Sequence, residues 1–540
     1  MTTVANRWTG TGVAPGTAVA AVWRADRPVP ALAGPLDPGR VEAAYHAVAA
    51  DLTGLADRVR AQGRGSAADI VATGALIATD PGLVAAARTA AGSAEPVSAI
   101  LDAVEGYARM FDGLADETLR ERAADVRQVG RRVVEHLTGA GQPPASGRFV
   151  LVAGDVGPAD LLEQLARGLV AAVTVRGGAN SHAAIVARSV GLPLVVGVDA
   201  EVLDLPDGTP LLVDADAGAV VAAPPPDELY RVEQAALRRA RRQAALAAER
   251  QRPHVTADGY RFELLCNVAS DTEVRLGRDS GAEGIGLLRT ELSFLHSGQW
   301  PDGAEHRRVL RPILTEAAGW PVTVRLLDFA GDKVPPFLDP AAAGLPALLR
   351  NPDALVAQLR AIVDLGSEVT LRIMVPMVTE PGQLRAVRDA VQGIPVGAMV
   401  ETVAAVDAIG ELSAVADFFS IGTNDLTAEV LGLDRTDPRA RPQLAADPRV
   451  LRLVARVVAG TDRPVSVCGD AGAHPTTLPL LLGAGVRRFS VACARLDEAR
   501  YRLRRLDITT CADLTAQALE LPDVESVEAL VRQRIQEALP

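Results

Sequence analysis

The sequence lacks the features that would assign the chain to a secreted, disulfide-rich or membrane-spanning class. Its four cysteines are scattered, so they suggest neither a disulfide framework nor the paired spacing of a metal site. The apolar runs are far too short to span a bilayer. The opening MTTVANRWTGTG has no apolar core after a basic stretch, so we expect no secretory signal. The cytoplasm is therefore the expected compartment.

Positive charge is also scarce, because 67 acidic residues outnumber 55 basic ones and the formal net charge is −12. Nucleic-acid backbones and anionic membranes require basic surface, so neither is expected to be the main partner. The chain of 540 residues is 48% hydrophobic and 23% charged. This composition indicates a folded protein with room for roughly three or four domains.

Lysine is nearly absent, since Lys333 is the only one among the 55 basic residues. A compact ammonium group with three donors is not interchangeable with a guanidinium group at a tight site. We therefore interpret Lys333 as a candidate site residue. The alternative is chance survival in an arginine-biased coding sequence.

The first half of the chain combines two patterns. The opening GTGVAPGTAVAAVW reads as a strand, and four helical stretches follow between residues 37 and 139. Short apolar runs then alternate with helical pieces, at 148–153, 169–175, 193–198 and 210–214. We expect an α/β domain of residues 1–36 and 145–225, an all-helical insert of 37–144, and a charged linker helix of 226–252.

The second half, residues 253–540, contains eight strand-like segments, most of them separated by helical stretches. This arithmetic predicts a (β/α)8 barrel of the TIM type, with its chemistry at the carboxyl ends of the strands. The segments are RFELLCNV, GIGLLRT, VTVRLLDF, TLRIMVPM, VGAMVET, DFFSIGT, PVSVCGD and RRFSVA. The polar residues at their ends are Asn267, Arg289, Arg325, Asp328, Glu401, Asn424, Asp425, Cys468 and Ser490.

A candidate nucleophile follows the apolar run 169–175. A glycine turn leads into ANSHAAIVARSVG, where Asn180 can cap a helix that has His182 in its first turn and ends at Gly191. A helix start disfavours imidazolium and favours a bound anion. A neutral imidazole there could attack phosphorus. The alternative is that His182 merely begins a helix.

These motifs resemble a known family. GGANSHAAIVARSVGLPLVVG resembles the phosphohistidine motif of phosphoenolpyruvate-utilising enzymes. The barrel segments resemble enzyme I of the phosphoenolpyruvate:sugar phosphotransferase system, through GAEGIGLLRTELSF, VRLLDFAGDK, LRIMVPM, GAMVET and DFFSIGTNDLT followed by LDR. The resemblance covers nearly the whole chain. It implies a swivelling histidine domain that takes the phosphoryl group of phosphoenolpyruvate and passes it to the phosphocarrier protein HPr.

The resemblance also implies roles in the barrel. Glu401 and Asp425 end neighbouring strands, where they could hold Mg²⁺ or be ordinary strand-end acids; family position favours the metal. Cys468 stands where the family places the general acid that protonates the enolate. The residues implied to bind substrate are Arg289, Arg325, Lys333, Asn424 and Arg435, whose cationic members suit phosphate and carboxylate groups.

Two partner expectations come from the resemblance. HPr would dock on the helical insert, with residues 70–84 forming part of the surface, unless these apolar residues are simply core. A homodimer through the barrel domain is expected on resemblance alone.

Several departures from the family keep other functions open. The segment 339–352 is shortened and has no clear equivalent of a phosphate-binding arginine. The chain could therefore be a degenerate regulatory protein that binds phosphoenolpyruvate. A fragment-like relative of phosphoenolpyruvate synthase or pyruvate phosphate dikinase is disfavoured, because the insert has no glycine-rich nucleotide loop. The other departures are Leu161 and Asn180 where threonines are usual, Asp470 for Glu, Val403 for Pro, and Ala428-Glu429 for Gln-Tyr.

Overall fold

The computed structural model forms two compact units, Met1–Ala240 and Arg241–Pro540. Each unit is described by itself. The structure describes residues 6–25, 30, 32, 34–61, 65–112, 117–139, 147–178, 181–295, 297–331, 333–339, 343–433, 437, 439 and 441–535.

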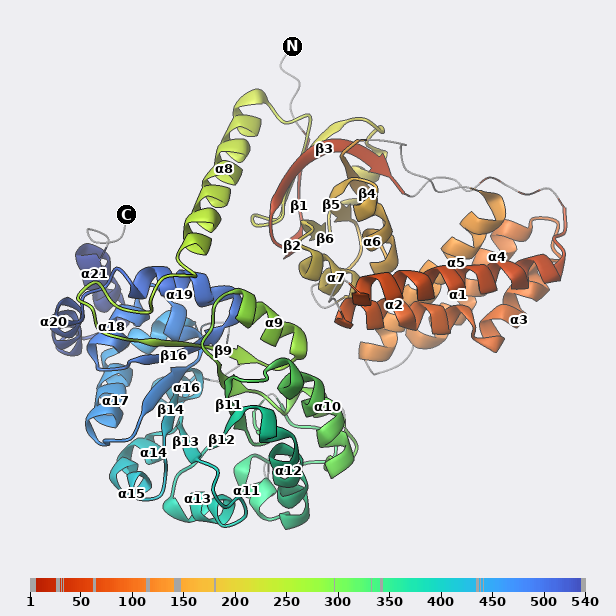
Figure 1. Cartoon of the computed structure of the whole chain (residues 1–540). Coiled ribbons are helices and arrows are strands. Elements are labelled where there is room, and N and C mark those ends of the chain that lie inside the picture. Colours follow the sequence, from red (N-terminus) through yellow and green to blue (C-terminus); the bar gives the residue numbers. More distant parts are fainter. Residues whose placement is uncertain are drawn as a thin grey trace. The chain divides into compact units, whose positions relative to one another are not determined.

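An eight-stranded sheet organises the first unit, in the order β1-β8-β7-β3-β4-β5-β6-β2 (Figure 1). Its centre, from β3 to β6, is parallel, and the outer strands pair antiparallel. The strands are β1 (Arg7–Thr9), β2 (Thr11–Ala14), β3 (Thr17–Arg24), β4 (Phe149–Ala153), β5 (Leu169–Thr174), β6 (Leu194–Val196), β7 (Pro210–Asp214) and β8 (Ala219–Ala222). Two helices accompany them, α6 (Pro158–Ala166) and α7 (His182–Val190).

The prediction of a single opening strand was wrong. The chain there forms β1, β2 and β3, which pair with β8, β6 and β7 respectively. Pro15 and Gly16 separate β2 from β3, and Gly16 has a φ of +131°, which favours glycine. Because of this turn, β2 lies at the edge of the sheet, whereas β3 lies between β7 and β4.

The helical insert has five helices in its described residues rather than the predicted four. They are α1 (Pro38–Ala61), α2 (Gly65–Ala78), α3 (Pro81–Ala90), α4 (Pro96–Asp112) and α5 (Glu117–Thr138). Their apolar core includes Ala159 and Leu162 of α6 and Val186 of α7. The insert therefore packs directly on α6 and on α7, the helix of the predicted histidine motif.

The second unit confirms the expected (β/α)8 architecture. Eight strands close into an all-parallel barrel in the order β10-β11-β12-β13-β14-β15-β16-β9. The strands are β9 (Glu263–Val268), β10 (Ile285–Leu288), β11 (Pro321–Arg325), β12 (Thr370–Val375), β13 (Val396–Val400), β14 (Phe419–Gly422), β15 (Val465–Cys468) and β16 (Arg488–Ala492). Each lies within one of the eight segments predicted from the sequence, or one residue beyond.

Helices surround the barrel and bury one continuous apolar core against it (Figure 1). They are α9 (Asp271–Asp279), α10 (Gly303–Glu316), α11 (Leu345–Leu349), α12 (Pro352–Leu365), α13 (Pro381–Arg388), α14 (Val403–Asp407), α15 (Ile409–Ser413), α16 (Thr423–Leu431), α17 (Pro448–Ala459), α18 (Thr477–Gly483), α19 (Leu496–Leu503), α20 (Ile508–Leu519) and α21 (Val524–Ile535).

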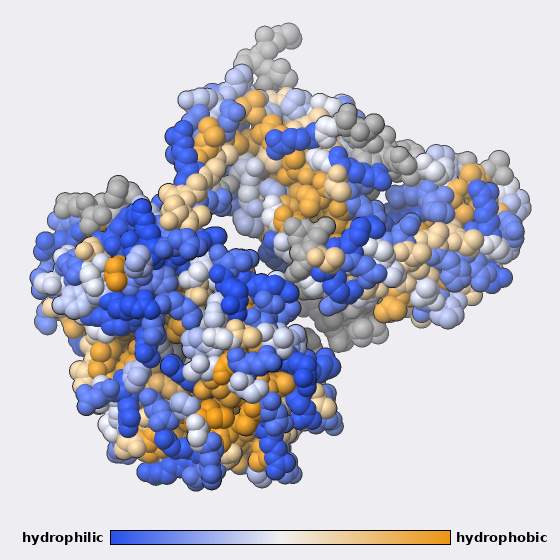
Figure 2. Space-filling view, in the orientation of Figure 1, coloured by the Kyte–Doolittle hydropathy of each residue, from blue (hydrophilic) through white to orange (hydrophobic). Residues whose placement is uncertain are grey.

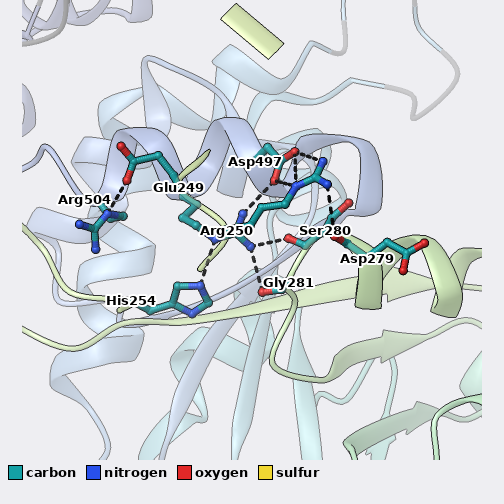
Figure 3. Close-up of polar contacts among 9 residues, drawn as sticks. Glu249, Arg250, His254, Asp279, Ser280, Gly281, Asp497 and Arg504 are labelled. Atoms are coloured by element: carbon teal, nitrogen blue, oxygen red, sulfur yellow. Dashed lines mark hydrogen bonds and ion pairs between the residues drawn. The ribbon is translucent and has the colours of Figure 1, made fainter. Parts of the chain in front are cut away.

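The charged helix α8 (Pro226–Ala248) ends in a set of ion pairs with the barrel unit, drawn in Figure 3. Arg250 donates to both carboxylate oxygens of Asp497 at 2.5–3.0 Å, and Glu249 accepts from Arg504 at 2.8 Å. Arg500, fully buried, also donates to Asp497 at 2.9 Å. These contacts anchor the residues that follow α8 to α19.

The surface seen in Figure 2 is a mosaic of hydrophilic and hydrophobic residues. All four cysteines are buried and free, as the scattered spacing indicated. Among the described residues, no single helix is long and apolar enough to cross a membrane. The bent pair Ala67–Ala78 and Pro81–Ala90 meets the same criteria of length and composition only when its two helices are taken together.

Candidate active site

His182 is the first residue of α7, as the sequence predicted. The Oγ of Ser181 accepts the backbone N–H of Ala184 at 3.3 Å and caps the helix. Gly191 ends it with a φ of +67°, also as predicted. The cap had been assigned to Asn180, which lies outside the described residues, so the assignment is corrected to Ser181. The local geometry places the imidazole where the N–H groups of a helix start favour an anion.

A carboxylate that the sequence analysis missed pairs with this imidazole. Asp125 of α5 lies 3.1 and 3.3 Å from the Nδ1 of His182 through its two oxygens. The side chains of His182 and Asp125 are only 15% and 10% exposed. Because a carboxylate accepts, the contact favours the tautomer with its proton on Nδ1 and its lone pair on Nε2. The two residues are 57 positions apart, so no local motif signals the pair.

Leu161 occupies the position where the resemblance implies a threonine that bonds the histidine. Its side chain is fully buried in the apolar cluster between α6, α7 and the sheet, together with Leu151, Leu169 and Ala184. No hydroxyl is available there. Asp125 approaches the ring from the helical insert instead.

In the barrel, Arg325 and Lys333 share one buried carboxylate. The Nη2 of Arg325 donates to Oε1 of Glu291 at 2.6 Å, and the Nζ of Lys333 donates to the same oxygen at 3.0 Å. Arg325 also pairs with Asp328 at 2.9 Å. Burial favours a raised pKa for Glu291, but the charges of Arg325 and Lys333 outweigh it and hold the pKa below its usual value. Glu291 was missed, although it lies within the quoted motif GAEGIGLLRTELSF, two residues after Arg289.

Glu401 directly follows β13 and is almost completely buried. Burial, and next the negative charge of Asp328, raise the pKa of Glu401 to about 8; Asp425 adds to the rise and Arg325 opposes it. One oxygen of Glu401 accepts the backbone N–H of Met377 at 2.7 Å. A Cβ at Gly422 would come within 2.8 Å of its other oxygen, so the close approach of β14 requires glycine.

The carboxyl groups of Glu401 and Asp425 fit a hard divalent cation, because they bring oxygen ligands to the carboxyl ends of the neighbouring strands β13 and β14. Within the described residues, no group of three or more His, Cys, Asp or Glu side chains is arranged to hold a metal ion. A cation held by Glu401 and Asp425 would therefore need substrate oxygens or water to complete its coordination.

Cys468 ends β15 inside the barrel, where it packs with Leu287, Met374, Met399 and Phe418. Burial raises the pKa of the Cys468 thiol to about 11, although Ser420, Arg325 and Arg289 act in the opposite direction. The group is therefore a protonated thiol at neutral pH, as a proton donor must be.

Asn424 contacts the loop that follows Cys468 at the end of β15. Its side-chain nitrogen donates to Asp470 at 3.2 Å, and its oxygen accepts the backbone N–H of Asp470 at 3.4 Å. Gly469 has a φ of +142°, and a Cβ there would meet the Oγ1 of Thr423 at 2.4 Å. Glycine thus lets the two loops touch.

The remaining predicted residues divide between the described and undescribed parts of the chain. Arg289 follows β10 and is close enough to Cys468 to lower the thiol pKa. Arg435 lies outside the described residues. In the shortened segment, α11 buries Leu345 and Leu348, and Arg350 is an exposed C-cap residue.

Comparison with known proteins gives consistent matches along the chain. Family models match residues 9–122 as the N-terminal part of phosphoenolpyruvate-utilising enzymes, 146–218 as their mobile domain and 243–508 as their phosphoenolpyruvate-binding domain. The fold and these three matches define a phosphoenolpyruvate-utilising enzyme with phosphotransferase chemistry.

Individual relatives narrow this class. The phosphoenolpyruvate-protein phosphotransferase of Geobacillus stearothermophilus is 32% identical over 459 residues, covering 79% of each chain. That of Streptomyces coelicolor is 33% identical over 515 residues, covering 91% of this chain and 90% of the relative. The chain belongs to the phosphoenolpyruvate-protein phosphotransferase family, as the motifs indicated.

Some relatives are much longer. The multiphosphoryl transfer protein of Xanthomonas campestris pv. campestris is 35% identical over 474 residues, which are 80% of this chain and 55% of the relative. The chain thus spans little more than half the length of that relative.

Proposed function

We propose that the chain transfers the phosphoryl group of phosphoenolpyruvate to His182, releases pyruvate, and passes the phosphoryl group to a histidine of an HPr-type phosphocarrier protein. The observation that carries the proposal is the pairing of Asp125 with Nδ1 of His182 at the start of α7. This pairing orients the ring and, in the neutral imidazole, keeps the proton on Nδ1 and the lone pair on Nε2, the proposed nucleophile. Family membership supports the same reaction.

In the first half-reaction, the Nε2 lone pair attacks phosphorus and the bond from phosphorus to the enol oxygen breaks. The electron pair leaves with the enolate of pyruvate. Arg289, Arg325 and Lys333 are the cations that we propose bind the phosphate and carboxylate groups and offset the charge of the transferring phosphoryl. Asn424 and Arg435 complete the proposed substrate-binding set.

The enolate carbon then takes a proton from the Sγ of Cys468, which yields pyruvate and a thiolate. The raised pKa of Cys468, about 11, keeps this proton on sulfur until the enolate forms. The thiolate regains a proton from solvent before the next turnover.

Glu401 and Asp425 are the proposed ligands of Mg²⁺, which when bound supplies positive charge that offsets the charge of the phosphate. Their carboxylates are the chain's own contribution to this site. We also propose the four-part domain division set out above, docking of the carrier on the helical insert, and a homodimer through the barrel domain.

The proposed docking segment 70–84 has both buried and exposed apolar side chains. Val71, Ala75, Ala78 and Leu83 are buried in the core of the insert, whereas Leu76 is 72% exposed. The exposed residues of α2 are therefore the part we propose for carrier contact.

Sedimentation with and without Mg²⁺ and phosphoenolpyruvate tests the dimer, and an active monomer would refute its coupling to activity.

A second candidate, a regulatory protein that binds phosphoenolpyruvate without transfer, is favoured by the shortened segment. There, buried apolar residues of α11 occupy the stretch without a clear equivalent of the family's arginine. One phosphate ligand is therefore absent from the proposed set.

The deciding experiment is incubation of the purified chain with phosphoenolpyruvate and Mg²⁺, with intact mass and pyruvate both measured. We expect one acid-labile phosphoryl group in the wild type and none in His182→Ala. Cys468→Ala should slow pyruvate formation, while Cys511→Ala, a buried cysteine of α20, should not. Binding without phosphorylation would support the regulatory protein instead.

A further inference from the structure

A small cavity beside His182 lies between α5, the loop before α6, the end of β5 and the start of α7. We propose that this cavity holds the phosphoryl group while His182 carries it, with Arg131 and Arg176 as its cationic ligands. The proposal rests on the proposed function and adds two phosphoryl-binding residues to the histidine unit.

The cavity has the right size for this role. Its volume is about 180 Å³, and its walls include Asp125, Arg131, Arg176, Ser181 and His182. A water molecule occupies about 30 Å³ of liquid, so the space equals about six waters. A phosphoryl group with a few waters fits, and the imidazole is part of the wall.

Arg131 and Arg176 differ from Arg127 and Arg132 in the contacts that their guanidinium groups make. Arg132 is bonded to Asp160 at 2.7 Å and to Glu163 at 3.0 Å, and Arg127 is bonded to Glu105 at 2.7 Å. Among the described residues, neither Arg131 nor Arg176 forms an ion pair.

Both guanidinium groups line the same cavity as the imidazole of His182. They provide the planar, multiple donors that bind phosphate oxygens.

A second carboxylate besides Asp125, that of Asp155, lines the same cavity and provides a variant for which the opposite effect is expected. Burial raises the pKa of Asp155, while Arg131 and Arg176 are close enough to lower it in part. One of its oxygens accepts the backbone N–H of Val156 at 2.9 Å. A phosphoryl dianion would compete with Asp155 for the same positive charge, so removing this carboxylate should favour the phosphorylated state.

The role of Asp125 agrees with this geometry. It engages Nδ1 of His182, so the phosphoryl group is carried on Nε2, the other side of the ring. The first-turn N–H groups of α7 add favourable electrostatics for an anion. Asp125 also lines the cavity, so the phosphoryl group would share this space with two carboxylates and two arginines, and the arginines would have to offset that negative charge.

The test uses the full chain and four variants: Arg131→Gln, Arg176→Gln, Asp155→Asn and, as a matched control, Arg167→Gln, an exposed arginine that does not line this cavity. The equilibrium between phosphoenolpyruvate plus free enzyme and pyruvate plus phosphoenzyme is measured from both directions. Phosphorus NMR of the phosphoenzyme gives the titration of the phosphoryl group itself. A merely structural role would leave both readouts unchanged.

We expect each arginine variant to shift the equilibrium about tenfold toward free enzyme, the effect of losing one hydrogen bond to a charged group. The phosphoryl group should also release its last proton at higher pH. Asp155→Asn should shift the equilibrium in the opposite direction, and Arg167→Gln should not shift it. Arginine variants within twofold of wild type in both readouts would overturn the proposal.

Phosphoramidate separates this proposal from the proposed function, because it donates a phosphoryl group to imidazole and releases ammonia without using the barrel. Labelling of His182 by phosphoramidate but not by phosphoenolpyruvate would refute the proposed function. The phosphorus NMR comparison would still decide the role of the cavity. Failure of phosphoramidate to label His182 would overturn the proposal, because an imidazole facing a phosphoryl site must accept the group.

Discussion

The two units handle charge in opposite ways. In the histidine unit, one imidazole pairs with one carboxylate, and both side chains keep a small exposed fraction, 15% for His182 and 10% for Asp125. In the barrel unit, Glu291 is fully buried between Arg325 and Lys333, and Glu401 is almost as deeply buried. The first arrangement leaves the proposed reactive nitrogen partly open to solvent, whereas the second holds charged groups fixed in the interior beside the proposed substrate site.

The two arrangements differ in how far their charged side chains are exposed to solvent. Charges interact more strongly in a low-dielectric interior, and a buried charge that loses its partner is costly. Substitutions at the buried barrel charges should therefore reduce stability as well as activity. Substitutions at the histidine should reduce activity and leave stability nearly unchanged.

The largest effect on stability is expected for Glu291→Gln. The change removes the buried negative charge that Arg325 and Lys333 share, and breaking such a buried pair costs about 3–5 kcal/mol. Urea unfolding followed by tryptophan fluorescence measures the loss. Glu368→Gln, an exposed acid of the same unit, is the control. A loss under about 1 kcal/mol would show that burial does not distinguish the two units.

His306 tests the same contrast through pH. It is fully buried on α10, and both ring nitrogens lack hydrogen-bond partners among the described residues. Burial lowers its pKa from 6.5 to about 4, opposed in part by Asp302. Below pH 6.5 the unfolded chain binds a proton that the folded chain does not, so stability present above pH 6.5 is lost as the pH falls toward 4.

The loss should reach about 3 kcal/mol at pH 4. The measurement is the free energy of unfolding of the wild type minus that of His306→Leu, determined from pH 7.5 to 4, because other titrating groups cancel in this difference. The free energy of unfolding of the wild type should fall relative to that of His306→Leu as the pH is lowered. A difference independent of pH would contradict the burial argument.

Asp125→Asn should affect chemistry rather than stability. A carboxylate only accepts, whereas the amide can also donate to Nδ1, so the tautomer is no longer fixed and phosphorylation of His182 should slow by about 10–100-fold. Rapid-quench measurement of phosphoenzyme formation gives the rate. Asp102→Asn, an exposed residue of α4, is the control. An unchanged rate would remove Asp125 from the mechanism.

The smallest effect is expected at the exposed pair of Arg242 with Glu498, 2.6 Å apart, in which Arg242 is 52% exposed. Solvent screens such a pair, so Arg242→Gln should change stability by less than about 1 kcal/mol. Urea unfolding measures the change, and repetition at high salt should abolish it. A loss as large as that of Glu291→Gln would mean that the end of α8 is held as rigidly as the barrel interior.

Much of the fold could be predicted because hydrophobic periodicity is a local property of the chain. The eight barrel strands, the start of α7 at His182 and its end at Gly191 all follow from short segments. The scarcity of lysine in the sequence also indicated Lys333 as a candidate site residue. The same local signals misjudged the opening strand, where Pro15 and Gly16 redirect the chain to another part of the sheet.

Tertiary structure alone decided which charged groups meet. Asp125 reaches His182 because the helical insert packs on α6 and α7, and Glu291 lies between Arg325 and Lys333 because β10 and β11 are neighbours in the barrel. Such pairs join residues far apart in the sequence, so no local pattern records them. The sequence by itself determined the strands, the helix start and the types of reactive residue. The packing of those elements determined the partners, the burial and therefore the protonation of each group.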